Sequence, residues 1–335
     1  MNNIALIGID LGKHSFHVHC QDNSGRALIR KKYTRAKLFE FLANTPSAKV
    51  VMEACAGSHF MARRISSLGH EAKLISPQFV RPFVKTNKND YVDAEAICEA
   101  ASRPSMRFVQ PKTENQQAMQ AMHCIRDSLI RDKVKTTNQM HAFLLEFGIG
   151  LPKGTAVIKR LSTILTENEL PPYLVQMLTR LHAHYCYLES QIKELDQLLQ
   201  QELKHDDTGQ RLLTMPGIGP ITASILSAQL SDGKQYASSK DFAASTGLVP
   251  RQYSTGGKNT LLGISKRGNK NLRRLLVQCA RSIMIHLDKY SGSLANWIRN
   301  QLCRKHSCVV ACALANKLAR IAWAITTSKT DFKFS

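Results

Sequence analysis

The sequence lacks an uncharged apolar run of the roughly 18 residues that a membrane-spanning helix needs. Its most apolar stretch, CVVACALANKLARIAWAI at residues 308–325, is interrupted by Lys317 and Arg320. This pattern favours an amphipathic or buried helix. The N-terminal MNNIALIGIDLG also has neither the basic segment nor the cleavage site of a signal peptide. We therefore expect no membrane partner.

The sequence also has no C-x-x-C pair, and its cysteines number nine, which is odd. Cys303, Cys308 and Cys312 cluster, but no paired ligands at zinc spacing lie nearby. This usage excludes a disulfide framework and argues against a structural zinc site. We expect nine reduced thiols in a cytoplasmic protein.

Acidic residues are scarce, with 25 Asp and Glu against 46 Lys and Arg, which gives a formal net charge of +21. Such an imbalance indicates a polyanionic partner. Residues 247–282 contain no acid at all and carry eight cations, which is typical of a phosphate-binding surface. The residues of this run that we predict to contact nucleic acid are Arg251, Thr255, Lys258, Lys266, Arg267 and Arg273.

The first hundred residues alternate strand and helix patterns. NIALIGID is a short apolar run, and residues 14–33 alternate with period two around the turn QDNSGR, which predicts a hairpin. Helix, strand, helix, strand and helix patterns follow, the last beginning at Asp90. The order βββ-α-β-α-β-α predicts an α/β fold with a mixed sheet and helices on its faces.

The middle of the chain is predicted to be helical. Residues 113–146 have a helical pattern, LPKG at 151–154 interrupts it, and a heptad seam then runs through Leu174, Leu178, Leu181, Tyr185, Leu188, Ile192, Leu195 and Leu199. This spacing predicts a coiled coil that joins protomers. The alternative is a long helix packed on its own domain.

A second domain begins after HDDTGQ at 205–210 with LLTMPGIGPITASIL. Gly217 and Gly219 lie between a helix end and a helix start, a pattern that resembles a helix-hairpin-helix presenting backbone N–H groups to a phosphate. A plain helix–loop–helix corner without a ligand is the alternative.

Four acids are candidates for a metal site. Asp10 and Glu53 each end a strand, and Asp90 and Asp93 lie about 60° apart on the helix that follows. If that helix crosses the strand ends, the four carboxylates converge, and a divalent cation would remove their repulsion. Oxygen ligands suit Mg²⁺ or Mn²⁺. Taken singly, Asp90 could be a helix N-cap and Asp93 a first-turn acid.

Two further features complete the predicted site. Lys85 and Lys88 precede the acidic helix and could contact a nucleic-acid backbone. Ser254 and Thr255 precede a Gly-Gly pair inside the acid-free run, where a hydroxyl ringed by cations could attack phosphorus or simply bind a phosphate. The sequence beside them offers no His or acid as a base, so an activating group would come from elsewhere.

These motifs resemble a known family. IGID at 7–10, MEACAG at 52–57 and KNDYVDA at 88–94 resemble the acidic motifs of the DEDD-type transposases of the one-ten family of bacterial insertion sequences. MPGIGPITA and GLVPRQYSTGGK…GISKRGNKNLRRLL resemble the C-terminal domain of that family, and the STGGK form is similar to its eleven-eleven subgroup. The resemblance spans nearly the whole chain in the right order.

The resemblance implies a RuvC-like domain of the RNase H fold over residues 1–145, with Asp10, Glu53, Asp90 and Asp93 as the Mg²⁺-binding tetrad. It implies a coiled-coil segment at 160–204 for dimer and tetramer assembly, and a mostly α-helical transposase domain at 208–328 with a serine nucleophile. Members are recombinases guided by a structured bridge RNA that pairs with donor and target DNA. A cytoplasmic, nucleoid-associated bacterial protein is expected.

The nucleophile has two possible positions. Matching the family pattern leftward from GISKRG gives Ser254, and matching rightward from GLVPRQY gives Thr255. We choose Ser254 because the family residue is a serine.

Parts of this pattern also occur in three other classes of protein. A RuvC-like Holliday-junction nuclease would share the tetrad but use water as its nucleophile. A sugar-kinase or actin-like ATPase would share IGIDLGK but needs a second glycine-rich phosphate motif, which we do not find. A nucleic-acid-binding protein that has lost catalysis would not need all four acids and the serine.

Overall fold

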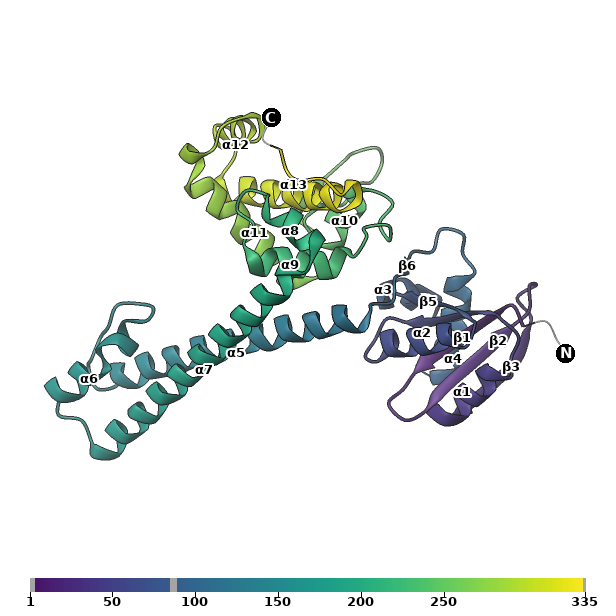
Figure 1. Cartoon of the computed structure of the whole chain (residues 1–335), viewed down its shortest axis with the longest axis horizontal. Coiled ribbons are helices and arrows are strands. Elements are labelled where there is room, and N and C mark those ends of the chain that lie inside the picture. Colours follow the sequence, from purple (N-terminus) through teal and green to yellow (C-terminus); the bar gives the residue numbers. More distant parts are fainter. Residues whose placement is uncertain (1–3, 85–88, 334–335) are drawn as a thin grey trace. The chain divides into compact units, whose positions relative to one another are not determined.

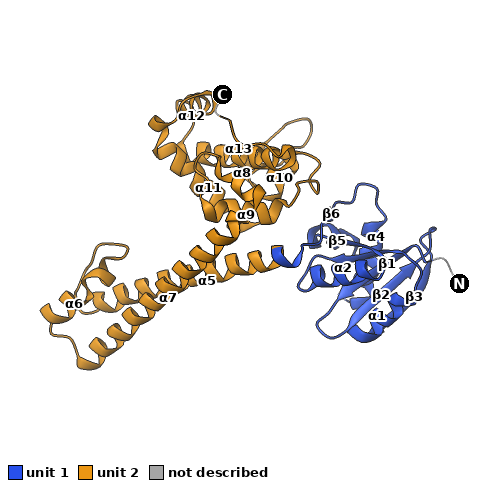
Figure 2. Ribbon diagram, in the orientation of Figure 1, with its two compact units in different colours: residues 1–115 blue, residues 116–335 orange. Residues whose placement is uncertain are grey.

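The computed structural model describes residues 4–84 and 89–333, and the chain divides into two compact units, residues 1–115 and 116–335 (Figures 1 and 2). Each unit is described by itself below. The first unit is a sheet covered by helices, and the second is almost entirely helical.

The first unit is built on a six-stranded sheet with the order β3-β2-β1-β4-β5-β6. Strands β1, β2 and β3 pair antiparallel, β4 and β5 continue from β1 in parallel, and β6 pairs antiparallel with β5. The strand bounds are β1 Leu6–Leu11, β2 Phe16–Gln21, β3 Ala27–Tyr33, β4 Lys49–Glu53, β5 Glu71–Ile75 and β6 Phe108–Val109.

The two faces of this sheet pack differently because alternate strand residues point to opposite sides. Ile7 and Ile9 belong to one core with residues of α1 (Arg35–Ala43) and α2 (Ser58–Ser67). Leu6 and Val51 belong to another core with residues of α4 (Asp90–Ala101). The short helix α3 (Pro77–Val80) and the 3₁₀ turn Arg81–Phe83 connect β5 to the segment before α4.

The predicted order βββ-α-β-α-β-α is confirmed, and so is the RuvC-like α/β fold. The edge strand β6 was missed because it has only two residues, too few for any periodic pattern to emerge. The packing boundary also lies earlier than the predicted domain end at 145, since α5 (Glu114–Leu145) packs on helices of the second unit.

Long helices form an arm in the second unit: α5, α6 (Ala156–Glu167) and α7 (Pro172–Lys204), with α5 and α7 running side by side (Figure 1). Arg126 of α5 forms an ion pair with Asp196 of α7, and Nζ of Lys133 lies 3.2 Å from Oε1 of Glu189. At the far end of the arm, Leu178 packs with residues of α5 and α6.

The heptad seam of α7 is therefore covered within the chain. Its buried members are Leu178, Tyr185, Leu188, Ile192 and Leu199, and its half-buried members are Leu174, Leu181 and Leu195. In the structure, α7 is thus a long helix packed on its own domain, which was the alternative prediction. Assembly of dimers or tetramers through the arm stays a prediction.

The remainder of the second unit is a helical domain around one core. Its helices are α8 Asp207–Leu213, α9 Pro220–Leu230, α10 Ser239–Ser245, α11 Lys270–Ile285, α12 Ser293–Leu302 and α13 Ser307–Ser328, with a 3₁₀ turn at Leu287–Lys289. The α13 helix is long and apolar enough to cross a membrane by length and composition alone, yet it contributes to the core through residues such as Leu314 and Leu318. The expected buried or amphipathic helix is what the structure shows.

The segment with Gly217 and Gly219, predicted to resemble a helix-hairpin-helix, joins α8 to α9. Gly217 has φ +70°, and a Cβ there would lie 2.6 Å from the side chain of Ile283 on α11, so this glycine is required by packing. Gly219 is the N-cap of α9 and has open space where a Cβ would be. A phosphate contact at this corner stays a prediction.

Candidate functional site

The position of helix α4 on the sheet depends on Gly8 of β1. A Cβ at this position would lie 2.5 Å from the carbonyl oxygen of Ala94 and 2.6 Å from Sγ of Cys98, both on α4. Glycine therefore allows the helix backbone to rest directly on the strand. This contact fixes the start of α4 near the end of β1, because Asp10 follows Gly8 on the same face of the sheet.

Two of the predicted acids lie on adjacent strands. β1 and β4 are parallel, with Gly8 opposite Val51 and Ile9 opposite Met52. Carried one residue further, this register puts Asp10 beside Glu53. Both side chains point to the face covered by α4, since Gly8 and Val51 do so two residues earlier.

The other two acids lie in the first turn of α4. The N-cap of this helix is Asn89, whose Oδ1 accepts a hydrogen bond from the Tyr91 backbone N–H at 3.0 Å. The alternative that Asp90 is the N-cap is therefore wrong. Asp90 and Asp93 are thus free of a capping role, and the positive end of the helix dipole favours both carboxylates.

The structure brings these acids together. Asp10 and Asp90 each offer a carboxylate oxygen, and His17 offers a ring nitrogen, all within 4.8 Å of one another. Partial burial raises the pKa of Glu53, and the neighbouring Asp10 and Asp93 carboxylates raise it further. Both of these carboxylates therefore lie close enough to Glu53 to disfavour its charged form.

The residues present fit a divalent metal ion. Carboxylate oxygens are the preferred ligands of Mg²⁺ and Mn²⁺. Burial raises the pKa of Glu53 most, and the nearby Asp10 and Asp93 carboxylates add to the rise. A cation would be held by the tetrad Asp10, Glu53, Asp90 and Asp93. Its charge would offset their mutual repulsion.

Sequence reasoning missed His17. It lies directly opposite Asp10 in the antiparallel β1–β2 pair, is only 4% exposed, and its Nδ1 is 3.5 Å from Oδ2 of Asp90. Its ring also makes an edge-on contact with Tyr91, at 4.8 Å between centroids. The alternation of HSFHVHC puts His17 on the face opposite Phe16 and Val18, but only the strand register shows that this face meets Asp10.

Lys85 and Lys88, predicted to contact a nucleic-acid backbone, lie outside the described residues. Their role stays a prediction.

The predicted nucleophile lies on a β-hairpin that the sequence did not suggest. β7 (Pro250–Gln252) and β8 (Leu261–Ile264) pair antiparallel, and the Lys258 N–H donates to the Thr255 carbonyl at 3.0 Å across a tight turn. Gly256 and Gly257 between them have φ +54° and +77°, as a type I′ hairpin turn requires. The glycines thus shape the turn, while a Cβ at either would meet open space.

Both candidate hydroxyls, Ser254 and Thr255, are exposed on this hairpin. Nε2 of Gln252 donates a hydrogen bond to Oγ of Ser254 at 2.8 Å. A neutral amide orients the hydroxyl but cannot remove its proton. Ser254 in this conformation is accessible to a phosphodiester but is not deprotonated by its observed partner.

Hydrogen bonds close the base of the hairpin, and one from α11 reaches the residues just before it. The Ser265 N–H donates to the Val249 carbonyl at 2.8 Å, and the Lys266 N–H donates to the Gly247 carbonyl at 3.1 Å. Arg273 of α11 donates from Nη1 to the Thr246 carbonyl at 2.9 Å. Arg273 therefore has a structural partner, and its predicted contact with nucleic acid is untested.

The remaining predicted cations, Arg251, Lys258, Lys266 and Arg267, are all exposed on the hairpin or just after it. Lys266 adopts φ +56°, which is uncommon for a residue with a side chain. The predicted basic surface is thus present on the outside of the second unit.

Comparison with known proteins covers both units. A transposase family profile, DEDD_Tnp_IS110, matches residues 7–149, and the profile described as "Transposase IS116/IS110/IS902 family" matches residues 209–294. The chain is 68% identical over 332 residues to the transposase for insertion sequence element IS1328 of Yersinia enterocolitica, covering 99% of both chains.

More distant relatives extend this likeness. The transposase for insertion sequence element IS1111A of Coxiella burnetii is 36% identical, over 99% of this chain and 92% of that protein. A pilin gene-inverting protein of Moraxella bovis is 23% identical, over 86% of this chain and 83% of that protein. With its DEDD-type acids on one sheet edge and a matching C-terminal domain, the chain belongs to the IS110/IS116/IS902 family of insertion-sequence transposases.

Proposed function

We propose that this transposase cuts and rejoins DNA strands through a covalent link between Ser254 and a DNA end, with Mg²⁺ or Mn²⁺ held by Asp10, Glu53, Asp90 and Asp93. The observation that carries this proposal is the convergence of acids from β1, β4 and α4, with the pKa of Glu53 raised by burial and by its acidic neighbours. When bound, the metal supplies stabilisation of negative charge on phosphoryl and leaving oxygens.

The chain's own residues carry the covalent step. Ser254 Oγ forms a bond to phosphorus, the bond from phosphorus to one deoxyribose oxygen breaks, and that oxygen leaves with a proton. The number of phosphoester bonds is unchanged, so the strand can be rejoined to a new end without an external energy source. The hydrogen bond from Gln252 orients Oγ for attack.

The proton of Ser254 needs an acceptor outside the hairpin, because Gln252 is neutral and residues 247–282 contain no acid. We assign its activation to the acidic site of the first unit, since a base or bound metal there can lower the barrier to deprotonation. The working site is then composite, with the acids and Ser254 supplied by two protomers of a dimer or tetramer.

Selection of donor and target DNA is proposed to depend on a bridge RNA. A net charge of +21 gives the chain enough cations for two kinds of nucleic acid, and base pairing with a guide leaves the protein to bind backbone and shape. Purifying the protein from cells that carry the whole element, then sequencing the bound nucleic acid, tests this part. Recovery of no specific RNA would contradict it.

The test of the covalent mechanism compares Ser254→Ala, Thr255→Ala and Asp10→Ala in a recombination assay, together with denaturing gels for a protein–DNA adduct. We expect Ser254→Ala and Asp10→Ala to abolish both recombination and the adduct, while Thr255→Ala retains them. An active Ser254→Ala with an inactive Thr255→Ala would move the nucleophile by one residue. If both hydroxyl variants recombine, the serine mechanism is wrong.

A second candidate is a RuvC-like nuclease that cuts junctions with water as the nucleophile. It is favoured by one observation: Ser254 accepts a hydrogen bond from an amide and has no basic partner shown in its hairpin. This candidate predicts cleavage that needs the four acids and divalent metal but yields no protein–DNA adduct.

A further inference from the structure

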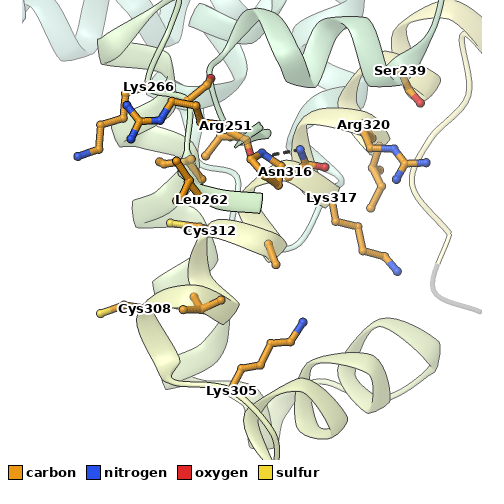
Figure 3. A pocket seen from close by; sticks show the side chains of 18 of the residues that line it. Ser239, Arg251, Leu262, Lys266, Lys305, Cys308, Cys312, Asn316, Lys317 and Arg320 are labelled. Carbon is orange, nitrogen blue, oxygen red and sulfur yellow. Dashed lines mark hydrogen bonds between the residues drawn. The ribbon is translucent and has the colours of Figure 1, made fainter. Parts of the chain in front are cut away.

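A groove beside the hairpin is lined by cations and apolar side chains. It encloses about 1150 Å³ between the hairpin strands, α13 and the turn after α12 (Figure 3). Among the described residues, its lining contains no acid and five cations, which are Arg251, Lys266, Lys305, Lys317 and Arg320. The positive charge of these side chains favours a polyanionic ligand.

The groove also has apolar surface between its cations. Leu262, Val309 and Trp297 contribute to the lining, and Nζ of Lys317 lies 4.7 Å from the Trp297 ring centroid. This cation–π contact holds an ammonium group beside an aromatic ring. Phosphate and base are the two parts of a nucleotide that such a pair of groups accommodates.

The apolar lining favours an unpaired strand over a duplex. Bases in a duplex present only their edges in the grooves, whereas the bases of a single strand expose their faces to apolar and aromatic side chains. The volume exceeds the range of about 300–1,000 Å³ for ordinary small-molecule pockets, so an extended segment fits better than one small ligand.

The groove shares its wall with the hairpin of Ser254. Arg251 of β7 lies three residues before Ser254, and Leu262 belongs to the returning strand β8. A nucleic-acid strand that lies against β7 and β8 therefore runs along the hairpin that carries the Ser254 hydroxyl. The backbone at the hairpin base is fixed further by Asn316 of α13, whose Nδ2 donates to the Leu248 carbonyl at 3.4 Å.

We propose that this groove binds an unpaired segment of the DNA strand that is cut, with phosphates on Lys305, Lys317 and Arg320 and bases against the apolar wall. The inference rests on the proposed serine mechanism for its choice of strand. In this proposal the groove takes no part in bond breaking. It holds the DNA strand on one side of the phosphodiester that is cut.

The test measures binding of fluorescein-labelled single-stranded DNA by anisotropy, using full-length protein with Ser254→Ala so that no covalent capture occurs. The groove variant carries Lys305→Gln and Lys317→Gln. The matched control carries Lys159→Gln and Lys193→Gln, two exposed lysines of the arm. We expect the groove variant to bind at least about tenfold more weakly and its log–log salt slope to fall by about 1.4, or 0.7 for each lost phosphate contact.

The control pair should bind as the parent does. The groove is not a single-strand site if its variant keeps the parental affinity and salt slope, or if it loses affinity only for RNA of the same sequence. Lys305→Gln alone provides a second variant, because Lys305 is exposed in a turn and its loss cannot unfold the core.

The choice of strand is tested with Ser254 restored. We expect the groove variant to form the protein–DNA adduct more slowly at subsaturating DNA. Adduct formation at the parental rate despite weaker binding would place a different strand in the groove. Failure of the serine mechanism has another signature, since recombination by Ser254→Ala would overturn that mechanism whatever the groove variant does.

Discussion

The acidic site of the first unit and the hairpin of the second unit are built in opposite ways. Asp10, Glu53 and Asp93 project from strands and a helix whose packing is fixed by direct backbone contact at Gly8. Ser254 projects from a hairpin in which every residue from 251 to 263 is exposed. The first site is thus fixed by packing within its own unit, while Ser254 lies on an exposed hairpin, where Gln252 donates a hydrogen bond to its hydroxyl.

The largest expected effect tests the acidic site in this comparison. Asp93→Asn removes a carboxylate from the first turn of α4 without changing its size, and we expect recombination to fall by at least about 100-fold. Glu99→Gln on the same helix is the control, because Glu99 pairs with Arg103 away from the site. If the two variants lose activity equally, the acids of α4 act through helix stability alone.

The next effect concerns the contact that positions α4. Gly8→Ala introduces a methyl group 2.5 Å from the Ala94 carbonyl oxygen, and we expect a loss of about 1–3 kcal/mol in the free energy of unfolding, together with loss of activity. Gly150→Ala, where an added Cβ meets nothing within 4 Å, should be near neutral. Denaturant unfolding measures both, and a stable, active Gly8→Ala would remove the proposed role of close packing.

The hairpin should respond in the opposite way, with activity more sensitive than stability. Gly257→Ala strains a backbone with φ +77°, at a local cost of about 1–2 kcal/mol. We expect about tenfold slower recombination with little change in global unfolding, because the hairpin is exposed. Gly257→Asn, which tolerates this conformation better, should recover part of the rate. Equal rates for wild type, Ala and Asn would show that turn shape does not matter.

The smallest effect reports the electrostatics of the acidic site. Because the pKa of Glu53 is raised in the folded chain, the folded state binds a proton more readily than the unfolded state. Stability should then fall as pH rises from the ordinary glutamate value of about 4.3 through the raised value. Glu53→Gln should remove this loss and raise Tm by roughly 1–3 °C in chelator.

Added Mg²⁺ should cancel the advantage of Glu53→Gln, because the cation offsets the repulsion in the wild type. Thermal scans with chelator and with Mg²⁺ at two pH values measure this. A variant that is less stable than wild type under every condition would show that Glu53 is not repelled by its neighbours.

Much of the first unit was predictable because its signals are local. The apolar run at 4–10 and the alternation at 14–33 follow periodicities that tertiary packing did not override. The convergence of Asp10, Glu53 and Asp93 was also predictable, since strand ends and a following helix meet at one edge.

What could not be predicted depends on pairing between distant segments. His17 faces Asp10 only through the β1–β2 register, and the two-residue strand β6 exists only because β5 presents an edge. A heptad seam such as that of α7 can pack against a partner chain or against a helix of the same chain such as α5. The spacing of the apolar residues therefore could not decide between a coiled coil of two chains and a helix packed on its own domain. The β7–β8 hairpin was hidden because its strands have only three and four residues, which is too short for a clear alternation.

The left-handed backbone of Lys266 has a practical consequence. Glycine would relieve a strain of about 1 kcal/mol at this position, so a search for thermostable variants that ranks substitutions by melting temperature alone would select Lys266→Gly. The more stable variant would have lost one of the five cations of the groove. At this residue, a substitution that raises thermal stability is expected to weaken nucleic-acid binding, so a screen must measure both properties.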